Sequence, residues 1–432
     1  MAFLRTPIRY NRAAITSTAA QLTKLSAQIT TYLSSNNHAQ PTFAADSPTL
    51  PETPEYEALR NQATDSALDL LRLVNGPKNT FRTLFFSHTD LAAAQVALSR
   101  RFFAHVPNDG VGISASEVAA KAGMDADRAT RVLKMLATHR IFEEADGRFR
   151  HTAASAFLAD SVFSAMCEAS LDDFFKASAE MNGWVEGSPF EMGAENSPFV
   201  KRFGVSFYRE MEVKWKALRF SKAMDGWSLI DDNFAVLRDN FDWASLKNTK
   251  VVDVGGGNGH VSLDLARKFP DLTFTVQDLS QHQLDSTAAS YTDRIKFQQY
   301  NFFEPQPIRD AGIYLCRAIF HNHNDAESVL MLKALLPALE NRSDDPRILL
   351  NDVVVPERAE GKVTRSEENQ HRQLDLLMLA LFGAKERTKK DWVNLLREVD
   401  ERLEIVKMEY NPRGAGLLEI RLGKGPKTNS NL

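Results

Sequence analysis

The spacing of hydrophobic residues changes along the chain and separates a helical part from a part with alternating strands and helices. Long helical periodicity runs through residues 55–105. From residue 249 to 422, short apolar runs alternate with amphipathic segments, as in a mostly parallel sheet covered on both faces. Between residues 14 and 34, apolar residues also recur at helical spacing: Ile15, Leu22, Leu25, Ile29 and Leu33. The pattern predicts an α/β protein with a helical N-terminal part.

Breaks in this pattern suggest the domain boundaries. An amphipathic helix and a proline-bearing linker occupy 1–54, a helical and winged-helix dimerisation domain 55–165, connecting helices that line a pocket 166–245, a Rossmann-like α/β domain 246–422, and a flexible tail 423–432. The last two strands, 403–409 and 417–422, are joined by a short turn with Asn411, Pro412 and Gly414. We therefore expect an antiparallel hairpin at one edge of the sheet.

Residues 113–158 have the pattern of a winged helix. Ser116 is the expected cap of a helix to Ala122, and Asp125 or Asp127 is the expected start of a second helix to His139. A hairpin follows around Asp146-Gly147. The second helix could read DNA through Arg128, Arg131 and Lys134. However, residues 113–151 hold seven Lys/Arg against six Asp/Glu, a weak charge excess for contacts with phosphates. A dimerisation surface or a pocket wall is the simpler hypothesis.

Composition narrows the class of protein. A net charge of −4 argues against a general nucleic-acid binder, and no stretch approaches a membrane span. Two cysteines, Cys167 and Cys316, are too few for a disulfide framework, so a reducing, cytoplasmic location is expected. One alternative stays open: the N-terminus carries basic residues and no acidic residue before Asp46, like a mitochondrial transit peptide. Its basic residues are Arg5, Arg9, Arg12 and Lys24.

The run from Val251 to His260 carries the strongest chemical signal, because an apolar strand passes into clustered glycines. Glycine permits positive φ and lets a ligand approach backbone N–H groups. The dinucleotide fingerprint G-x-G-x-x-G lacks its third glycine here. Instead, Asp253, Gly255, Gly257 and Gly259 form a tighter G-x-G-x-G turn, which suits a ligand with an ammonium and a carboxylate but no phosphate.

A second strand, 273–277, ends at Asp278, about 20 residues past the loop, where a carboxylate can bind both hydroxyls of a ribose. S-adenosylmethionine fits this combination. An ordinary glycine-rich βα turn is the alternative, and the strand before it, the helix after it and the spacing of Asp278 weigh against that alternative.

Three later segments supply candidate catalytic groups. His321 follows the apolar strand 312–316, at a carboxyl strand end where open α/β sheets present their sites. A histidine there can act as a general base. Asp352 ends the expected strand 348–352, and Glu386 lies at the entry of an expected helix. If both bracket His321, they would hold its ring and stabilise the imidazolium. Taken singly, these residues could equally be a structural histidine, a turn cap and a helix cap.

Residues 203–227 are rich in aromatic residues and methionine at helical spacing, which is more often a protein core than a pocket for an aromatic ligand.

Together these motifs resemble the plant and fungal caffeate-type O-methyltransferases, and the fungal secondary-metabolite branch, such as sterigmatocystin O-methyltransferase, is the most similar. The resemblance rests on the ordered runs at 251–260, 276–279, 319–322, 347–352 and 384–388 and covers about residues 55–422. It implies an S-adenosylmethionine-dependent O-methyltransferase, with S-adenosylhomocysteine as product, no metal, and a small aromatic, polyketide-derived acceptor as its partner. It also implies a homodimer through the N-terminal helices, without nucleic acid or membrane.

The resemblance also assigns roles by position. It implies His321 as catalytic base, flanked by Asp352 and Glu386. The implied cofactor residues are Asp253, Gly255, Gly257, Asp278, Asn301, Phe302 and Arg317, and the implied substrate residues are Met224, Phe320 and Met378. The chain departs from the family at Asn301 and Asn322, where aspartate is usual. It also has Asp352 in place of a glutamate, which shortens the reach toward His321 by one methylene.

Two other functions stay open at this point. Some fungal proteins with this fold keep S-adenosylmethionine but catalyse dehydration or pericyclic cyclisation. Those relatives tend to replace the catalytic histidine, whereas His321 and two candidate acidic partners are present here. A non-catalytic, DNA-binding regulator is the third hypothesis, and it predicts salt-dependent binding without a need for His321.

Overall fold

The computed structural model describes residues 14–160, 162–227, 229, 233–280, 293–357 and 363–423. They form two compact units, one reaching to Ser164 and including Thr364–Ser366, the other comprising Ala165–Val363 and the residues from Glu367 onward. The expectations for Arg5, Arg9 and Arg12, and for the tail from residue 424, lie outside the described residues. Among the described helices, none is both long and apolar enough to span a membrane.

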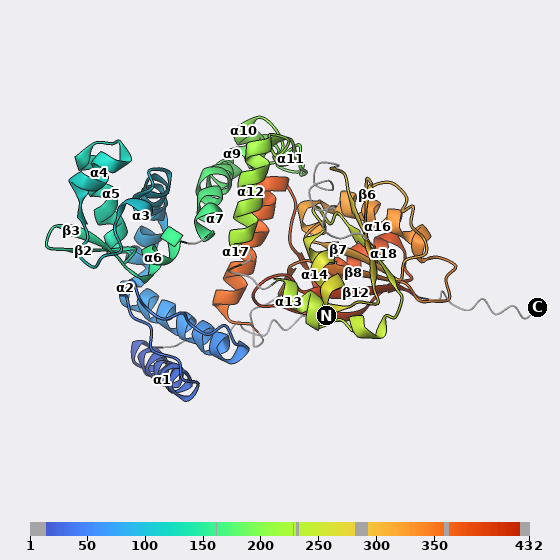
Figure 1. Cartoon of the computed structure of the whole chain (residues 1–432), viewed down its shortest axis with the longest axis horizontal. Helices are drawn as coiled ribbons and strands as arrows, with labels where there is room; N and C mark the ends of the chain where they lie inside the picture. Colours follow the sequence, from blue (N-terminus) through green and yellow to red (C-terminus); the bar gives the residue numbers. More distant parts are fainter. Residues whose placement is uncertain are drawn as a thin grey trace, which may run out of the picture. The chain divides into compact units, whose positions relative to one another are not determined.

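The first unit begins with two packed helices (Figure 1). Helix α1 spans Ile15–Ser35 and buries Leu25 and Leu33, each 1% exposed. Helix α2 spans Pro54–Ser99, and the Thr53 side chain caps it by accepting the Tyr56 N–H. At Gly76 the backbone leaves helical geometry (φ 63°, ψ 175°), and Pro77 follows, so α2 is kinked there. A short helix α3, Phe102–His105, ends this part.

The next elements have the expected order, with one corrected cap. Strand β1 (Ile113–Ser114) leads into α4 (Ala115–Ala122), whose cap is Ser114 and not Ser116. The reason is a capping box, in which Ser114 and Glu117 bond each other's backbone N–H. Asp125 caps α5, and the hairpin strands pair with β1 in the order β1-β3-β2. These are α5 (Ala126–Thr138), β2 (Phe142–Ala145), β3 (Arg148–His151) and, after them, α6 (Ala153–Asp160).

The label winged helix stays a prediction for this region. Its proposed DNA-reading face is partly used within the chain, because Lys134 Nζ donates to Glu144 Oε1 of the hairpin at 2.7 Å.

Short helices connect this region to the sheet, and the aromatic residues on them divide into two groups. Phe199 and Phe207 are buried, with ring centroids 5.3 Å apart, as the core interpretation predicts. Tyr208 and Met224 keep 43% and 37% exposure. The connecting elements are α7 (Phe163–Ala169), a π-helical turn η1 (Ser170–Phe174), α8 (Phe175–Ser178), α9 (Met181–Gly187), α10 (Pro198–Phe203), α11 (Phe207–Glu210), α12 (Lys214–Trp227), α13 (Asn233–Asp239) and η2 (Trp243–Ser245).

A seven-stranded sheet in the order β11-β12-β8-β7-β4-β5-β6 organises the second unit. Five strands are parallel, from β8 to β6, while β12 is antiparallel to both β8 and β11. The fold class and the edge hairpin predicted from the sequence are confirmed. The strands are β4 (Lys250–Val254), β5 (Thr273–Asp278), β6 (Ile295–Gln299), β7 (Ile313–Arg317), β8 (Arg347–Asn351), β11 (Leu403–Glu409) and β12 (Leu417–Leu422).

Helices cover both faces of this sheet, and alternate strand residues show which face each helix covers. Val252, Tyr314 and Ile348 belong to a core with α16 (Asp325–Leu339) and α18 (Lys389–Val399). Their neighbours Val251 and Ile313 belong to a second core with α13 and α14 (His260–Lys268). Successive strand residues point to opposite faces of the sheet. The apolar runs that predicted buried strands are therefore covered by helices on both sides.

A second, very small sheet lies beyond the end of β8. Strand β9 (Val354–Val355) pairs in parallel with β10 (Arg387–Thr388), in the register Arg387 to Val354. Helix α17 (Arg365–Phe382) precedes β10 in the chain, and α18 follows it. This pairing brings the residue after β8, Asp352, and the residue before β10, Glu386, into one part of the fold.

Candidate active site

Four strands of the large sheet end in polar residues. Strands β4, β5, β7 and β8 are parallel neighbours, so their carboxyl ends meet at one edge of the sheet. Asp253 stands near the end of β4, Asp278 ends β5, Arg317 ends β7, and Asp352 follows β8. Residues that are far apart in the sequence therefore share one end of the second unit.

The glycine loop has the backbone geometry that the sequence predicts. Gly255, Gly257 and Gly259 have φ of 71°, 56° and 75°, a region that side chains with a Cβ rarely adopt. The Gly255 and Gly256 N–H groups both donate to the Gln277 carbonyl, at 2.8 and 3.1 Å, which joins the loop to β5. A Cβ on Gly256 would lie 2.5 Å from the Asp253 carboxyl carbon. The loop is therefore shaped by its backbone, with Asp253 directly beneath it.

The Asp253 carboxylate is buried at 2% exposure and accepts a 2.6 Å hydrogen bond from Ser262 Oγ. Burial raises the pKa of Asp253 to about 6, against the opposing effects of Ser262 and Arg317. Asp278 faces the same loop: its Oδ2 accepts the Gly257 N–H at 3.1 Å, and its Oδ1 accepts the Ser280 N–H at 2.9 Å.

The segment with Asn301 and Phe302, two of the implied cofactor residues, lies against a histidine that sequence reasoning missed. Asn301 Oδ1 accepts the Phe303 N–H at 3.1 Å, which fixes a local turn. Phe302 meets the His323 ring edge-on, with centroids 5.4 Å apart, and Tyr208 stacks on the same ring at 6.3 Å. The sequence did contain a signal for it: His323 is a second histidine two positions after His321, and the chain nearby is rich in phenylalanine.

His321 lies in a one-turn 3-10 helix, η3 (Phe320–Asn322), that follows β7. Its Nδ1 is 2.9 Å from Oε1 of Glu386, whose side chain is 1% exposed while that of His321 is 19% exposed. This contact occupies Nδ1 and leaves Nε2 for another partner. Burial opposes a charge on the ring, but the Glu386 carboxylate outweighs it and raises the pKa of His321 to about 9. Asp352 acts in the same direction.

Asp352 and Glu386 lie on either side of this turn but differ in what they hold. Asp352 is 1% exposed, and its Oδ2 accepts the Phe320 N–H at 3.2 Å instead of bonding the His321 ring. The expectation that both carboxylates hold the ring is therefore corrected: the shorter side chain reaches the backbone of the preceding residue. Within the described residues, Asp352 Oδ1 and Glu386 Oε2 are buried acceptors without a donor. Burial raises the pKa of both carboxyl groups.

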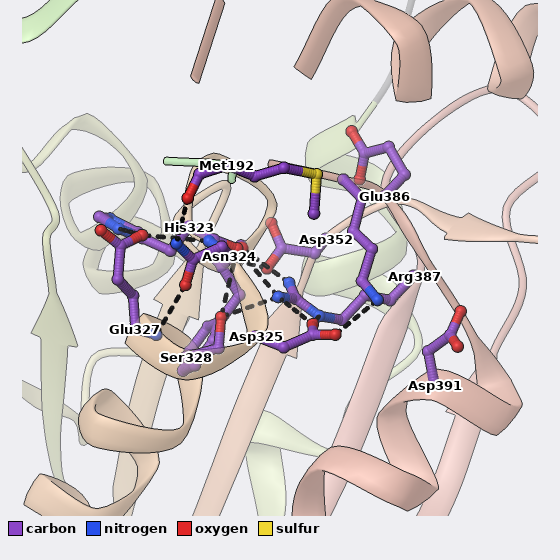
Figure 2. A network of polar contacts seen from close by, with 12 residues as sticks. Met192, His323, Asn324, Asp325, Glu327, Ser328, Asp352, Glu386, Arg387 and Asp391 are labelled. Atoms are coloured by element: carbon purple, nitrogen blue, oxygen red, sulfur yellow. Dashed lines mark hydrogen bonds and ion pairs between the residues drawn. The ribbon is translucent and has the colours of Figure 1, made fainter. Parts of the chain in front are cut away.

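Glu386 is not at a helix cap, because Thr388 caps α18 with Asp391. Its own backbone N–H donates to Asp375 Oδ1 of α17 at 2.9 Å. The next residue, Arg387, has a fully buried guanidinium that donates to the carbonyl of Phe320. It also donates to the carbonyl of His323 (Figure 2). Sequence reasoning gave Arg387 no role, since backbone acceptors leave no motif.

The three substrate residues implied by the resemblance differ in their surroundings. The Phe320 ring is 0% exposed and packs edge-on against Trp392 at 5.7 Å, so a substrate contact through this ring is corrected to a core contact. Met378 is buried on α17, the helix that also carries Asp375, and Met224 is partly exposed on α12. Their place beside an acceptor ring stays a prediction.

Comparison with known proteins identifies the family. A model of the O-methyltransferase domain matches residues 187–400. O-methyltransferase sol2 of Alternaria solani is 42% identical over 417 residues, which cover 95% of this chain and 96% of sol2. The chain belongs to the O-methyltransferase family. Its fungal relatives, sol2 among them, place it with the secondary-metabolite type, as the sequence motifs indicate.

Several solved structures have the same fold as this O-methyltransferase. OxaC in complex with SAH and oxaline has a TM-score of 0.73 at 21% identity and covers 94% of this chain and 100% of that one. A protein described as a pericyclic reaction enzyme has a TM-score of 0.69 at 19% identity, with coverage of 94% and 100%. The fold alone therefore admits both methyl transfer and a pericyclic reaction.

S-adenosylmethionine is the methyl donor of the O-methyltransferase family, and the residues of this chain fit it. The loop offers glycines at positive φ where a Cβ would intrude, and Asp253 and Asp278 stand beneath and beside that loop. Phe302 packs edge-on against His323, and its ring is the candidate contact for a planar base. These are the groups expected to hold the donor.

Proposed function

We propose that the chain transfers the methyl group of S-adenosylmethionine to a phenolic or enolic hydroxyl of a small, polyketide-derived secondary metabolite, with His321 as general base. The observation that carries the proposal is the 2.9 Å contact between His321 Nδ1 and the buried Glu386 carboxylate. It fixes which ring nitrogen is engaged and which one is left to receive a proton.

The roles of the residues follow from this geometry. Bound S-adenosylmethionine supplies an electrophilic methyl group on a sulfonium. His321 Nε2 accepts the hydroxyl proton of the acceptor, and Glu386 stabilises the imidazolium that results. Asp352 holds the backbone that carries His321. Positioning of donor and acceptor supplies much of the remaining rate.

The electrostatics of the base have a consequence for its pH dependence. With a pKa near 9, His321 in the free protein holds its proton at neutral pH. The fraction of free enzyme with a neutral His321 ring therefore rises as pH approaches 9, and kcat/KM for the acceptor rises with it. Glu386 thus favours the product side of the proton transfer and lowers the amount of free base at pH 7.

A phenolic acceptor is supported by the aromatic residues near the turn. Tyr208, His323 and Phe382 bring their rings together, with Tyr208 5.5 Å from Phe382. Flat, polarisable surfaces of this kind suit ring systems. Relatives named in the comparison include a chlorophenol O-methyltransferase of Trichoderma longibrachiatum, 29% identical over 388 residues.

We also propose that the chain is a homodimer that pairs with a second copy through α2. One stretch of this helix leaves large apolar side chains in solvent, with Val74 64%, Leu84 63% and Phe85 65% exposed. Large apolar side chains exposed on one helix favour association. Light scattering should give twice the chain mass, and Phe85→Glu should lower the mass toward one copy. A wild-type protein that remains a monomer at micromolar concentration contradicts this proposal.

The activity is tested with methyl-labelled S-adenosylmethionine and a panel of phenolic polyketides, by mass spectrometry of wild type and His321→Ala. Label should appear in an acceptor and fall by about 10²- to 10⁴-fold in the variant, the usual contribution of a general base. Donor binding, measured by calorimetry, should be the same in both proteins. Methyl transfer that survives in His321→Ala would remove the base assignment and leave the methyltransferase assignment standing.

A repurposed enzyme is the alternative, favoured by the likeness in fold to a pericyclic reaction enzyme. It predicts tight binding of the donor, isomerisation or dehydration of a substrate, and no label in the product. The buried Glu386 beside His321 weighs against it, because a base with a dedicated carboxylate partner suits proton removal from a hydroxyl.

A further inference from the structure

Arg387 is a buried cation whose donors converge on the turn that carries His321. Its side chain is 1% exposed. Nη1 donates to the Phe320 carbonyl at 2.8 Å. Nη2 donates to the His323 carbonyl and to Ser328 Oγ, both at 2.9 Å (Figure 2). Nε and Nη2 also reach Asp325 Oδ1, at 3.0 and 2.8 Å. The acceptors therefore flank His321, one residue before it and two residues after it.

Phe320, the residue immediately before His321, is held at three points. Asp352 accepts its N–H at 3.2 Å, and Arg387 donates to its carbonyl. Its ring meets Trp392 edge-on at 5.7 Å, and the Arg387 guanidinium lies over the same indole at 5.3 Å. The backbone leading into His321 is therefore fixed by side chains from two other parts of the chain, leaving little freedom for the direction of the imidazole.

Glu386 and Arg387 act on the same turn in different ways. Glu386 bonds the His321 ring, while Arg387 bonds the backbone on each side of it. The pairing of β10 with β9 fixes Arg387 opposite Val354, two residues after Asp352. Ring contact and backbone contacts thus come from two neighbouring residues, Glu386 just before β10 and Arg387 at its start.

We propose that Arg387 is a positioning residue for the base, holding the 320–323 turn so that His321 keeps Nδ1 on Glu386 and presents Nε2 to the acceptor. This rests on the proposed role of His321 as base. The guanidinium fork suits the task, because it can reach carbonyls three residues apart while a lysine ammonium cannot span both.

The charge of Arg387 supports this role over simple packing. Burying a cation is costly unless its hydrogen bonds are complete, and an apolar side chain would often serve packing as well. The carboxylate partner, Asp325, has a half-exposed side chain. Burial tends to raise the pKa of Asp325, but Lys385 and Arg387 outweigh burial and lower it, so this partner stays ionised.

Lys385 supplies a matched control. It carries the same charge, lies two positions before Arg387 on the same segment, and bonds the same carboxylate, with Nζ 2.6 Å from Asp325 Oδ2. Unlike the buried Arg387, its side chain is 35% exposed. Lys385→Gln removes a cation beside Asp325 while the bonds of Arg387 to the two carbonyls remain.

The kinetic test compares Arg387→Lys with Lys385→Gln in the full chain. Arg387→Lys should lower kcat about 10²-fold, the scale expected when a reacting group is misplaced by about 1 Å. The KM for S-adenosylmethionine should change by less than about twofold, because the glycine loop is untouched. Lys385→Gln should keep kcat within about twofold.

A double variant separates positioning from a general loss of structure. When Glu386→Gln has already released the ring, adding Arg387→Lys should reduce kcat by no more than about threefold, since both changes act through His321. Full multiplication of the two losses overturns the proposal. So does an Arg387→Lys loss that matches its loss of folded fraction in a thermal melt.

A readout that does not depend on turnover is the His321 titration, followed by NMR with ¹³C-labelled histidine and assigned from His321→Ala. Arg387→Lys should lower the pKa of His321 from about 9 toward its ordinary value, because the ring leaves Glu386, and Lys385→Gln should not. An unchanged titration in Arg387→Lys refutes the positioning role. If methyl transfer survives in His321→Ala, the base role of His321 fails, while this titration still tests whether Arg387 holds the ring on Glu386.

Ser328→Ala keeps the test available if Arg387→Lys does not fold. It deletes one neutral acceptor of Nη2 and leaves the charge in place. We expect a loss of about threefold in kcat and a smaller fall in the pKa of His321. No change in either quantity counts against the proposal.

Discussion

The two ends of the site are built on opposite plans. At the cofactor end, the loop of 255–259 is shaped by its own backbone, with three glycines at positive φ and N–H groups bonded to the adjacent strand β5. At the base end, His321 depends on charged side chains that are distant in the chain: Glu386 is 65 residues away and Asp352 contacts Phe320 from 32 residues away.

This difference explains what each end tolerates. A backbone-shaped loop is sensitive to a single added Cβ but indifferent to many side chains around it. A turn fixed by buried carboxylates and a buried guanidinium is sensitive to charge and reach, because each lost partner leaves another buried group unsatisfied. Variants at the two ends should therefore separate into effects on donor affinity and effects on kcat.

The largest effect on kcat among the flanking carboxylates is expected at Glu386. Glu386→Gln removes the charge that holds the imidazolium, and kcat should fall about 10²-fold while the Kd of the donor stays within about twofold. Steady-state kinetics and calorimetry measure both. Glu340→Gln, a carboxylate bonded to Arg402 at the surface, is the matched control and should leave kcat unchanged. A raised Kd with normal kcat contradicts the division into two ends.

The pH profile of the same variant sharpens this prediction. Glu386 raises the pKa of His321 to about 9, so kcat/KM of wild type should rise with pH up to that region. Without the charge of Glu386 the pKa of His321 falls, and the rising limb should move to lower pH. A limb that stays in place shows that the titrating group is not His321.

Gly255→Ala probes the other end. A residue with a Cβ at φ 71° costs about 1–2 kcal/mol, so the affinity for the donor should fall about 5- to 30-fold. At saturating donor, kcat should return to within about threefold of wild type. Gly187→Ala, a helical glycine with open space at its Cβ position, serves as control. A kcat that stays low at saturating donor contradicts the division between effects on donor affinity and effects on kcat.

Asp352 gives a smaller effect, because its partner is a single backbone N–H. Asp352→Asn keeps an oxygen for the Phe320 N–H and should lower kcat by about threefold, whereas Asp352→Leu removes the acceptor and should lower it about tenfold. Equal losses in the two variants point to the charge of Asp352 rather than to its hydrogen bond. Kinetics at pH 8 compare the two.

The smallest effect is expected at Ser262. Ser262→Ala deletes the hydrogen bond that favours ionised Asp253, so the pKa of Asp253 rises above about 6. A larger protonated fraction at neutral pH should weaken donor binding about threefold at pH 6.5, and the difference should vanish at pH 8. Calorimetry at both pH values checks this, and a deficit independent of pH contradicts it.

Sequence reasoning succeeded where the signal is local. The signals for the glycine loop, for Asp278 at the end of β5 and for the edge hairpin each lie within about 20 consecutive residues. The cap of α4 was misplaced because two serines compete there, although only Ser114 has glutamate three residues later. The base end was harder: nothing in the sequence says that Asp352 bonds a backbone N–H, or that Arg387 gathers carbonyls, since those contacts depend on strand register.

The pairing of β9 with β10 gives this enzyme an expected order of failure. Each strand has two residues, and together they form their own small sheet, so opening them costs far less than disturbing the seven-stranded sheet. A brief opening would carry Glu386 and Arg387 away from His321 while β4 and β5 keep the glycine loop intact. Mild warming or low urea should therefore abolish turnover before it releases the methyl donor, leaving a population that is loaded but idle.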